Sequence, residues 1–287
     1  MRTSLLILSF LSSFISLGQN QLEPELKTIG NNSFFEISND SNSKLLVFLH
    51  GGVNNPYFRR SADSIDFDYL IEANTEFVNQ SVINGFDLIV PISKDSLNWL
   101  QNPKTSLKIL KEILNQSGKE NREIYIAGFS DGGTGSFKMF YSDPDYFAGL
   151  IVFNGYPQHK NFNKTVNYQS IENKKILFFS TYKDKVIPYE FLIDAYCAQK
   201  KSNSNTFIYL ASGDHSFSSY DRDDLKEVFE ILLDQNSNTE KIPIQGFIKN
   251  DKVITLYPFR KKILRKYGFG QELYEANRRQ KKINSRP

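Results

Sequence analysis

Six short apolar runs constrain the fold of this chain more than any other feature of its sequence. Each run is almost continuously hydrophobic, whereas a strand with one solvent-exposed face would alternate apolar and polar residues. The runs are Leu45–Leu49, Phe86–Val90, Ile124–Ala127, Leu150–Phe153, Ile176–Phe179 and Phe207–Leu210. Strands of this kind need cover on both faces of their sheet, so the pattern favours an α/β fold.

Amphipathic helical patterns lie between these runs. Ser106–Leu114 and Asp224–Leu233 carry apolar residues at helical spacing on one face. Because strands and helices alternate along the chain, we expect a doubly wound, mainly parallel sheet. Ser33–Ser38 is expected to add an antiparallel edge strand. With 287 residues, 40% of them hydrophobic, the chain has enough core material for one large α/β domain and an appendage.

The first 18 residues are predicted to be a secretory signal peptide. Arg2 is followed by an apolar run from Leu5 to Leu17 and by the small residue Gly18, after which we expect cleavage. The apolar run is too short to span a bilayer comfortably. A composition rich in Asn, Lys, Ile and Phe suits an AT-rich bacterial genome, and together with the signal peptide it leads us to expect a periplasmic or secreted bacterial protein. The chain has a single cysteine, which excludes an intrachain disulfide.

Residues 19–240 are predicted to form the main domain, and residues 241–287 a basic appendage with 13 Lys or Arg against three Asp or Glu. Gly246–Tyr257 is expected to form a hairpin that turns at Asn250–Asp251, followed by a basic helix over 260–286. Two interpretations of the appendage remain open, a weak contact with an anionic surface and a solvated helix face. Nucleic acid is not an expected partner, because the sequence lacks the aromatic interleaving and groove motifs of nucleic-acid binders.

The segment Gly128–Gly132 fits the pattern G-x-S-x-G and lies between a predicted strand and a predicted helix. At such a junction the serine adopts strained backbone angles, and the flanking glycines let neighbouring backbone pass close by. The hydroxyl then points out from the carboxyl edge of the sheet, where open α/β sheets bind their ligands. Glycine and serine also form ordinary turns, but in this context the motif indicates a nucleophile at Ser130.

A serine nucleophile needs a general base near neutral pH, and the sequence offers only three histidines. His215 is the expected base, because it directly follows the last predicted strand and precedes the final amphipathic helix. His50 is expected to shape the loop after the first apolar run. His159 is expected to lie in a loop near the rim of the site.

A carboxylate is expected to hold this histidine in the right tautomer and to stabilise its protonated form. Asp184 is the predicted residue, because it follows the strand before the histidine strand. It also completes the chain order Ser, Asp, His that this architecture requires. Asp214 is adjacent to His215 in the sequence, but the side chains of neighbouring residues usually diverge, so Asp214 is expected to act within the loop or as a cap.

Backbone N–H groups are expected to stabilise the oxyanion that develops on a substrate. One of them is the N–H of Asp131, directly after the serine. The second is expected from the loop that follows Leu45–Leu49. There Gly52 and Val53 are both candidates, and the sequence does not separate them.

Three aromatic residues near the expected carboxyl edge are candidates for contact with the substrate: Trp99, Tyr156 and Tyr182. Core packing is an equally good interpretation of Trp99. The long crossover 56–84 is expected to carry a helix over the site. No cluster of His, Cys and carboxylate residues has the spacing of metal ligands, so neither a metal nor an organic cofactor is expected.

With these motifs in place, residues 33–236 resemble the α/β-hydrolase superfamily. The resemblance rests on Leu49–Gly52, Gly128–Gly133, Asp184–Pro188 and Gly213–His215. Ala127–Gly133 and Gly213–Phe217 look most like secreted esterases of the feruloyl-esterase and polyhydroxyalkanoate-depolymerase type. This resemblance implies hydrolysis of carboxylic esters, in small molecules or polymers, through an acyl-enzyme.

Two other functions remain open at this point. A serine peptidase of the prolyl-oligopeptidase type uses the same chain order, although no long propeller-like region precedes the predicted catalytic domain. A catalytically silent hydrolase fold could serve as a binding module. The complete set of Ser130, Asp184 and His215 argues against the silent module, so serine ester hydrolysis is the function that the sequence favours.

Overall fold

The computed structural model describes residues 23–38, 44–53, 55, 61–94, 97–156, 171, 173–181, 183–189, 191–192, 195–196, 199, 205–233, 248–249 and 252–253. Several predicted features lie outside these residues, namely the signal peptide, the basic C-terminal helix, His159 and Tyr182.

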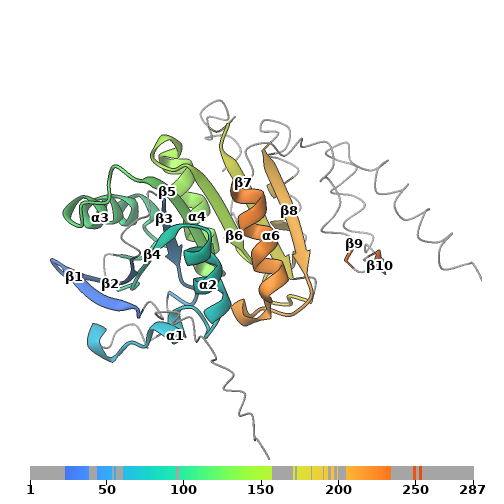
Figure 1. The fold of residues 1–287 in the computed structure, drawn as a ribbon, viewed down its shortest axis with the longest axis horizontal. Coiled ribbons are helices and arrows are strands. Elements are labelled where there is room, and N and C mark those ends of the chain that lie inside the picture. Colours follow the sequence, from blue (N-terminus) through green and yellow to red (C-terminus); the bar gives the residue numbers. More distant parts are fainter. Residues whose placement is uncertain are drawn as a thin grey trace, which may run out of the picture.

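An eight-stranded sheet forms the centre of the described part of the chain (Figure 1). Its strands lie in the order β1-β2-β4-β3-β5-β6-β7-β8. The strands are β1 (Glu25–Ile29), β2 (Asn32–Ile37), β3 (Lys44–Leu49), β4 (Phe86–Pro91), β5 (Glu123–Phe129), β6 (Gly149–Phe153), β7 (Lys175–Thr181) and β8 (Thr206–Ala211). All six apolar runs of the sequence lie within β3 to β8, so the predicted core strands are confirmed.

The strands from β3 to β8 run parallel, and β2 pairs antiparallel with β4 on one side and with β1 on the other. The mainly parallel sheet is therefore confirmed. The antiparallel strand expected over Ser33–Ser38 is confirmed as β2, but its expected place at the edge of the sheet is wrong, because β1 pairs with β2 on the outer side. The outermost strand, β1, was not predicted, because its sequence Glu-Leu-Lys-Thr-Ile mixes polar and apolar residues. Charged residues on an edge strand discourage pairing with a second chain.

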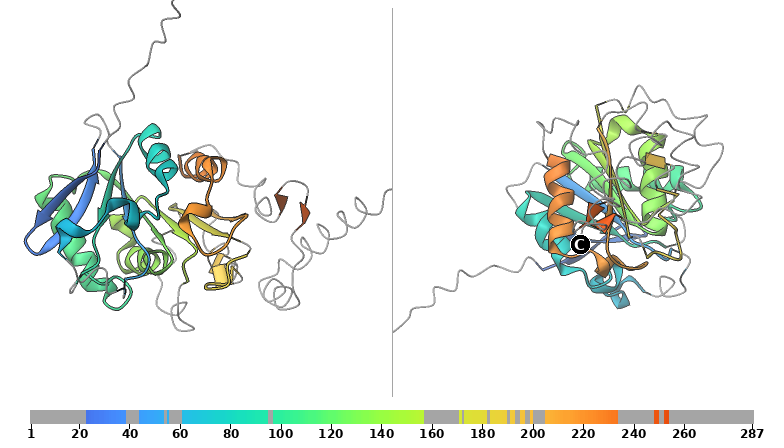
Figure 2. Two further views of the ribbon diagram at one scale, coloured as in Figure 1. Left: turned by 90° about the horizontal axis from the view of Figure 1, so that it is seen from below. Right: turned by 90° about the vertical axis from the view of Figure 1, so that its right-hand side faces the viewer.

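Helices cover both faces of this sheet (Figure 2). They are α1 (Phe67–Leu70), α2 (Thr75–Ile83), α3 (Pro103–Gln116), α4 (Asp131–Ser142) and α6 (Arg222–Leu233). α3 and α4 pack on one face, and α2 and α6 pack on the other. In β3, Val47 and Leu49 belong to the first of these core layers, whereas Leu46 and Phe48 belong to the second. Both faces of the strand are thus buried, which explains its continuous apolar sequence.

The two helices predicted from amphipathic spacing are confirmed as α3 and α6. Among the described helices, none combines the length and the apolar character that crossing a membrane would require.

The helix expected over the site in crossover 56–84 packs on a face of the sheet instead. Phe77 of α2 is fully buried against Phe48 of β3 and against Phe217, with ring centroids 4.8 and 5.1 Å apart. Asn74 caps α2 by accepting the Phe77 N–H at 3.1 Å. The expectation is therefore wrong for the described part of this crossover, because the apolar face of α2 needs the cover of the core.

Beyond the sheet, β9 (Ile248–Lys249) pairs antiparallel with β10 (Lys252–Val253). The two residues between these strands are Asn250 and Asp251, where the sequence predicted the turn of a hairpin. The remainder of segment 241–287 lies outside the described residues, so its basic helix stays a prediction.

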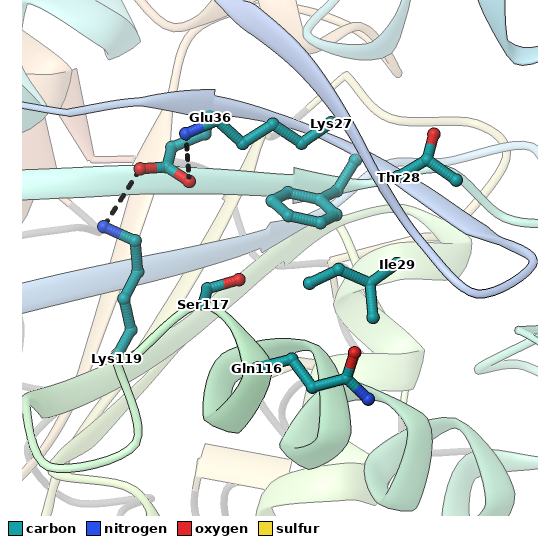
Figure 3. A pocket seen from close by; sticks show the side chains of 8 residues that line it. Lys27, Thr28, Ile29, Glu36, Gln116, Ser117 and Lys119 are labelled. Atoms are coloured by element: carbon teal, nitrogen blue, oxygen red, sulfur yellow. Dashed lines mark ion pairs between the residues drawn. The ribbon is translucent and has the colours of Figure 1, made fainter.

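A group of charged side chains is buried beside β2 and β4. Asp87 is fully buried and accepts hydrogen bonds from Lys119 Nζ at 3.3 Å and from Arg122. Lys119 Nζ also lies 3.0 Å from a carboxylate oxygen of Glu36, and the other oxygen of Glu36 lies 3.3 Å from Lys27 Nζ (Figure 3). Each buried carboxylate therefore has cationic partners, which such burial requires.

Lys27, Glu36 and Lys119 also line a cavity of about 370 Å³, shown in Figure 3. The cavity lies beside β1 and β2, and β4 and β3 separate these strands from β5. Lys27 is paired with Glu25 and Glu36, and Lys119 is paired with Glu36 and Asp87, so each lysine of the cavity already has carboxylate partners. We therefore assign this end of the sheet a structural role.

We expect Asp87→Ala to lower the free energy of unfolding by about 3 kcal/mol, because it removes one partner from a buried ionic group. Urea unfolding at neutral pH measures this loss. The matched control is Lys27→Met, whose side chain is 37% exposed and whose removal should cost no more than about 1 kcal/mol. Equal losses in the two variants would contradict the buried-cluster interpretation.

Candidate active site

β5 ends immediately before Ser130, and α4 begins immediately after it. Ser130 has φ of 55° and ψ of −117°, a combination that residues other than glycine rarely adopt. Its N–H donates to the Phe153 carbonyl at 2.9 Å, and its own carbonyl accepts the Thr134 N–H at 3.0 Å. These two bonds hold the strained residue at a sharp turn between strand and helix, as a nucleophile elbow requires.

Two glycines are needed here because separate backbone segments touch at this turn. A Cβ atom at Gly128 would overlap the Gly132 carbonyl oxygen. A Cβ atom at Gly132 would overlap the carbonyl oxygen of Leu49, the last residue of β3. The predicted close passage of neighbouring backbone is thus confirmed, and it brings the loop after β3 next to the first turn of α4.

Three side chains predicted from the sequence meet at the carboxyl edge of the sheet. The distance from His215 Nε2 to Ser130 Oγ is 2.9 Å, and the distance from His215 Nδ1 to Asp184 Oδ2 is 2.7 Å. Ser130 follows β5, Asp184 lies beyond β7 and His215 lies beyond β8. Because these strands are parallel, residues far apart in the sequence form one series of hydrogen bonds.

The Asp184 side chain is fully buried and well supplied with donors. Its Oδ1 accepts the N–H groups of Val186 and Ile187, each at 2.8 Å. Its Oδ2 accepts from His215 and from Asn154 Nδ2, the latter at 2.6 Å. Burial raises the pKa of Asp184, but the hydrogen bonds that it accepts outweigh burial and leave this pKa below its ordinary value. Because an ionised carboxylate only accepts, His215 Nδ1 carries a proton and Nε2 faces the serine as the acceptor.

The loop that carries His215 is held by the turn before α2. The Glu72 carboxylate accepts the Phe217 N–H at 2.6 Å and the Ser216 hydroxyl at 3.0 Å. Asn74 Nδ2 donates to the Phe217 carbonyl at 2.8 Å. Sequence reasoning missed these contacts, because they join polar residues on remote segments. The structure marks Glu72 only by its backbone, which has a positive φ of 50°.

Asp214 does not face the ring of His215, although it is adjacent in the sequence. Its carboxylate accepts a hydrogen bond from the Ser219 hydroxyl at 3.1 Å. Its carbonyl accepts the Thr181 hydroxyl at 2.5 Å. These contacts agree with the role within the loop that the sequence suggested for Asp214.

His50 is almost fully buried behind the site. Its Nδ1 lies 2.7 Å from the Gly51 carbonyl oxygen, and its Nε2 accepts the Ser93 N–H at 3.0 Å. Burial lowers the pKa of His50 to about 4, so the ring is neutral near neutral pH. His50 thus shapes the loop after β3, as the sequence suggested.

The predicted oxyanion donors lie in two adjoining segments. Asp131 is the first residue of α4, so its N–H has no acceptor within the helix. The Val53 N–H donates to Asp131 Oδ2 at 3.2 Å. Gly52, with φ of 63°, directly precedes Val53, and among the described residues no acceptor for the Gly52 N–H is found. Among the described residues, the Val53 N–H is therefore engaged and the Gly52 N–H has no acceptor.

The carboxylates around the site belong to separate segments and do not form one cluster. Asp131 is half-buried, and burial raises its pKa against the opposing effects of the Val53 N–H, His215 and Lys138. Asp184 and Glu72 accept from other backbone segments. Within the described residues, no group of three or more His, Cys, Asp or Glu side chains could hold a metal ion.

Residues 90–233 match the family model described as Phospholipase/Carboxylesterase. This match spans half of the chain and includes Ser130, Asp184 and His215. The chain belongs to the phospholipase/carboxylesterase family. It is thus an esterase-type hydrolase of the α/β-hydrolase superfamily.

Solved structures share the fold of this phospholipase/carboxylesterase family member. A predicted CIB-like hydrolase from Thermoplasma acidophilum has a TM-score of 0.53 and 15% identity, covering 74% of this chain and 97% of that chain. The Pyrococcus furiosus esterase Pf2001 has a TM-score of 0.54 and 13% identity, covering 73% and 91%. The fluorophosphonate-binding serine hydrolase F of Staphylococcus aureus has a TM-score of 0.50 and 14% identity, covering 71% and 93%. At these identities the likeness shows the fold alone. No curated protein sequence matches significantly.

Of the three aromatic residues expected to contact a substrate of this family member, the structure describes two. Trp99 is fully buried and packs edge-on against His50, with ring centroids 4.8 Å apart. It exposes no surface to a substrate, so the core-packing interpretation describes its position. Tyr156 is half-buried at the carboxyl edge, and its ring lies 4.3 Å from that of Phe191, centroid to centroid. It stays a candidate.

Asn154 is a residue of the site that sequence reasoning missed. It directly follows β6 and is fully buried beside Asp184. The dipeptide Asn154–Gly155 looks like an ordinary turn. The signal that could have found it is its position after a parallel strand, at the same edge of the sheet as Ser130.

We expect the stability of this family member to fall between pH 6.5 and about pH 4, partly through His50. The unfolded chain binds a proton at His50 near pH 6.5, but the folded protein binds it only near pH 4. Acid in this window therefore favours the unfolded state, by about 3 kcal/mol over the whole window. In His50→Gln, whose side-chain oxygen can still accept the Ser93 N–H, this part of the loss should disappear.

Urea unfolding of both proteins at neutral pH and near pH 4 measures the difference. The same loss of stability in wild type and variant would show that His50 does not contribute to it.

Proposed function

We propose that this chain hydrolyses carboxylic esters through an acyl-enzyme on Ser130, with His215 as the general base and Asp184 as its carboxylate partner. The observation that carries the proposal is the series of two hydrogen bonds, at 2.9 and 2.7 Å, that joins the serine hydroxyl to a buried carboxylate. Membership of the phospholipase/carboxylesterase family supports an ester as the substrate.

Acylation begins when Ser130 Oγ attacks the ester carbonyl carbon and His215 Nε2 takes the hydroxyl proton. The protonated ring is stabilised by the Asp184 carboxylate, which remains ionised. The tetrahedral intermediate then expels the alcohol, whose oxygen receives the proton from Nε2. The product of this half-reaction is an ester between the acyl group and Ser130.

The oxyanion of the intermediate is proposed to accept the N–H groups of Asp131 and Gly52. Both N–H groups lack an acceptor among the described residues, and both belong to segments that pack together at the elbow. The Val53 N–H is already bound to Asp131 Oδ2, and this bond ties the loop of Gly52 to α4. Val53 is thus proposed to position the loop, and Gly52 to supply the second donor.

Deacylation repeats the sequence with water as the nucleophile. His215 Nε2 takes a proton from water, the hydroxide attacks the acyl carbon, and the oxyanion again forms against the same two N–H groups. Collapse breaks the bond to Ser130 Oγ, which recovers its proton from His215. The acid product leaves, and every step balances without a cofactor.

We expect Ser130→Ala to lower kcat for p-nitrophenyl acetate by about 10⁴-fold or more, because alanine cannot form the acyl-enzyme. The matched control is Ser142→Ala, at the exposed end of the same helix, where the hydroxyl bonds only the Lys138 carbonyl. The control should hydrolyse the ester at the wild-type rate. Thermal unfolding establishes that both variants fold. A Ser130→Ala enzyme as fast as wild type would refute the proposal.

A panel of p-nitrophenyl esters and aminoacyl p-nitroanilides separates ester hydrolysis from peptide hydrolysis. We expect the wild-type protein to release nitrophenol from the esters and no nitroaniline above the Ser130→Ala background. Comparable turnover of the anilides would favour the peptidase. A protein that turns over neither class and does not react with a fluorophosphonate probe would be the silent binding module.

A further inference from the structure

Asn154 has an unusual backbone and no contact with solvent. It is fully buried at the end of β6 and has φ of 44°, in the left-handed region. Its N–H donates to the Phe179 carbonyl of β7 at 2.8 Å. Asparagine tolerates this conformation better than most residues, but it still costs free energy relative to an extended residue. Strained residues of this kind cluster at functional sites, so the contacts of the Asn154 side chain bear on its role.

The side chain of Asn154 connects three other polar groups. Its Nδ2 donates to Asp184 Oδ2 at 2.6 Å and to Thr181 Oγ at 3.0 Å. Its Oδ1 accepts the Tyr220 hydroxyl. An ionised carboxylate can only accept, so Nδ2 must face Asp184 and the orientation of the amide follows from its partners.

Tyr220 keeps that orientation. The ring is almost fully buried, with its centroid 5.1 Å from that of Phe153. Burial raises the pKa of Tyr220 well above its ordinary value, so the hydroxyl stays protonated and remains a donor. Asn74, in the turn before α2, donates to the Tyr220 carbonyl at 3.3 Å. The amide of Asn154 is therefore held from both ends.

We propose that Asn154 is a positioning residue for the reaction, which holds the carboxylate of Asp184 in line with His215 Nδ1. This inference rests on the proposed function of Ser130, His215 and Asp184. Asp184 Oδ1 is already fixed by two backbone N–H groups, so the contact at Oδ2 decides how the carboxylate is turned about its own axis. Asn154 Nδ2 donates to the same Asp184 oxygen that faces His215 Nδ1, so it holds this oxygen toward the ring.

The test uses two substitutions that the backbone of Asn154 accommodates. Asn154→Gly relieves the positive φ and removes the donor. Asn154→Asp keeps the shape of the side chain, and aspartate also tolerates positive φ, but it places a second acid against Asp184. Both should lower kcat for p-nitrophenyl acetate by roughly 10- to 100-fold, the equivalent of one hydrogen bond to a charged group, with KM unchanged.

A pH profile separates positioning from a purely structural role. An added carboxylate favours protonated His215, so Asn154→Asp should move the pH of half-maximal kcat/KM upward by about one unit. Asn154→Gly should leave the profile nearer to that of wild type. The other titratable groups around this region, Asp131, Glu72, Asp214 and Tyr220, are the same in both variants.

Tyr220→Phe is the second line of evidence, because it removes one hydroxyl and leaves Asn154 in place. We expect kcat to fall about fivefold, since the amide loses only the donor to its Oδ1. Thermal unfolding and circular dichroism give the folded fraction for each variant. Activity that falls only in proportion to the folded fraction, or an unchanged pH profile in Asn154→Asp at wild-type kcat, would overturn the inference.

The outcome for Asn154 is distinguishable from the outcome for the proposed function. If wild type and Ser142→Ala hydrolyse the ester and Ser130→Ala does not, the proposed function holds whatever the Asn154 variants do. If wild type is inert towards esters and towards a fluorophosphonate, the proposed function fails first, and the inference about Asn154 fails with it.

Discussion

The contact between the first turn of α4 and the end of β3 is the constraint on which the rest of the site depends. Because Gly132 lies against the Leu49 carbonyl, the chain must turn sharply at Ser130, and the serine takes its positive φ there. The same contact sets the loop of Gly52 and Val53 beside the first N–H groups of α4. The proposed nucleophile and the proposed oxyanion donors are therefore positioned by the same packing contact, and the apolar layers on both faces of the sheet keep that contact in place.

Buried carboxylates have different partners in two regions of the sheet. In β4, the buried carboxylate of Asp87 is paired with the cationic side chains of Lys119 and Arg122. At the carboxyl edge, Asp184, Asp131 and Glu72 accept backbone N–H groups from separate loops instead. Each of these carboxylates holds a loop of the site, and only Asp184 among them hydrogen-bonds the His215 ring in the described part of the chain.

Features encoded by short stretches could be predicted from the sequence, whereas pairings between remote polar residues could not. The core strands and the elbow at Ser130 follow from run length, apolar content and local glycines. The strand β1 was not predicted, because an edge strand does not need the continuous apolar sequence of a central strand. The bonds of Glu72 to the loop of His215 and of Asn154 to Asp184 escaped because neither local sequence differs from an ordinary turn. Trp99 was ambiguous for a related reason, since aromatic content does not say whether a side chain faces the core or a substrate.

By itself the sequence determined the α/β class, the elbow, and the order in which Ser130, Asp184 and His215 follow their strands. These features need only backbone preferences and the rule that parallel strands end at one edge. Tertiary structure alone decided that Asn154 and Glu72 bond to the site, that the Val53 N–H is engaged, and that the Gly52 N–H meets no acceptor among the described residues. The reason is physical, because hydrogen bonding and burial depend on distances between segments far apart in the chain, and those distances exist only once the sheet has assembled.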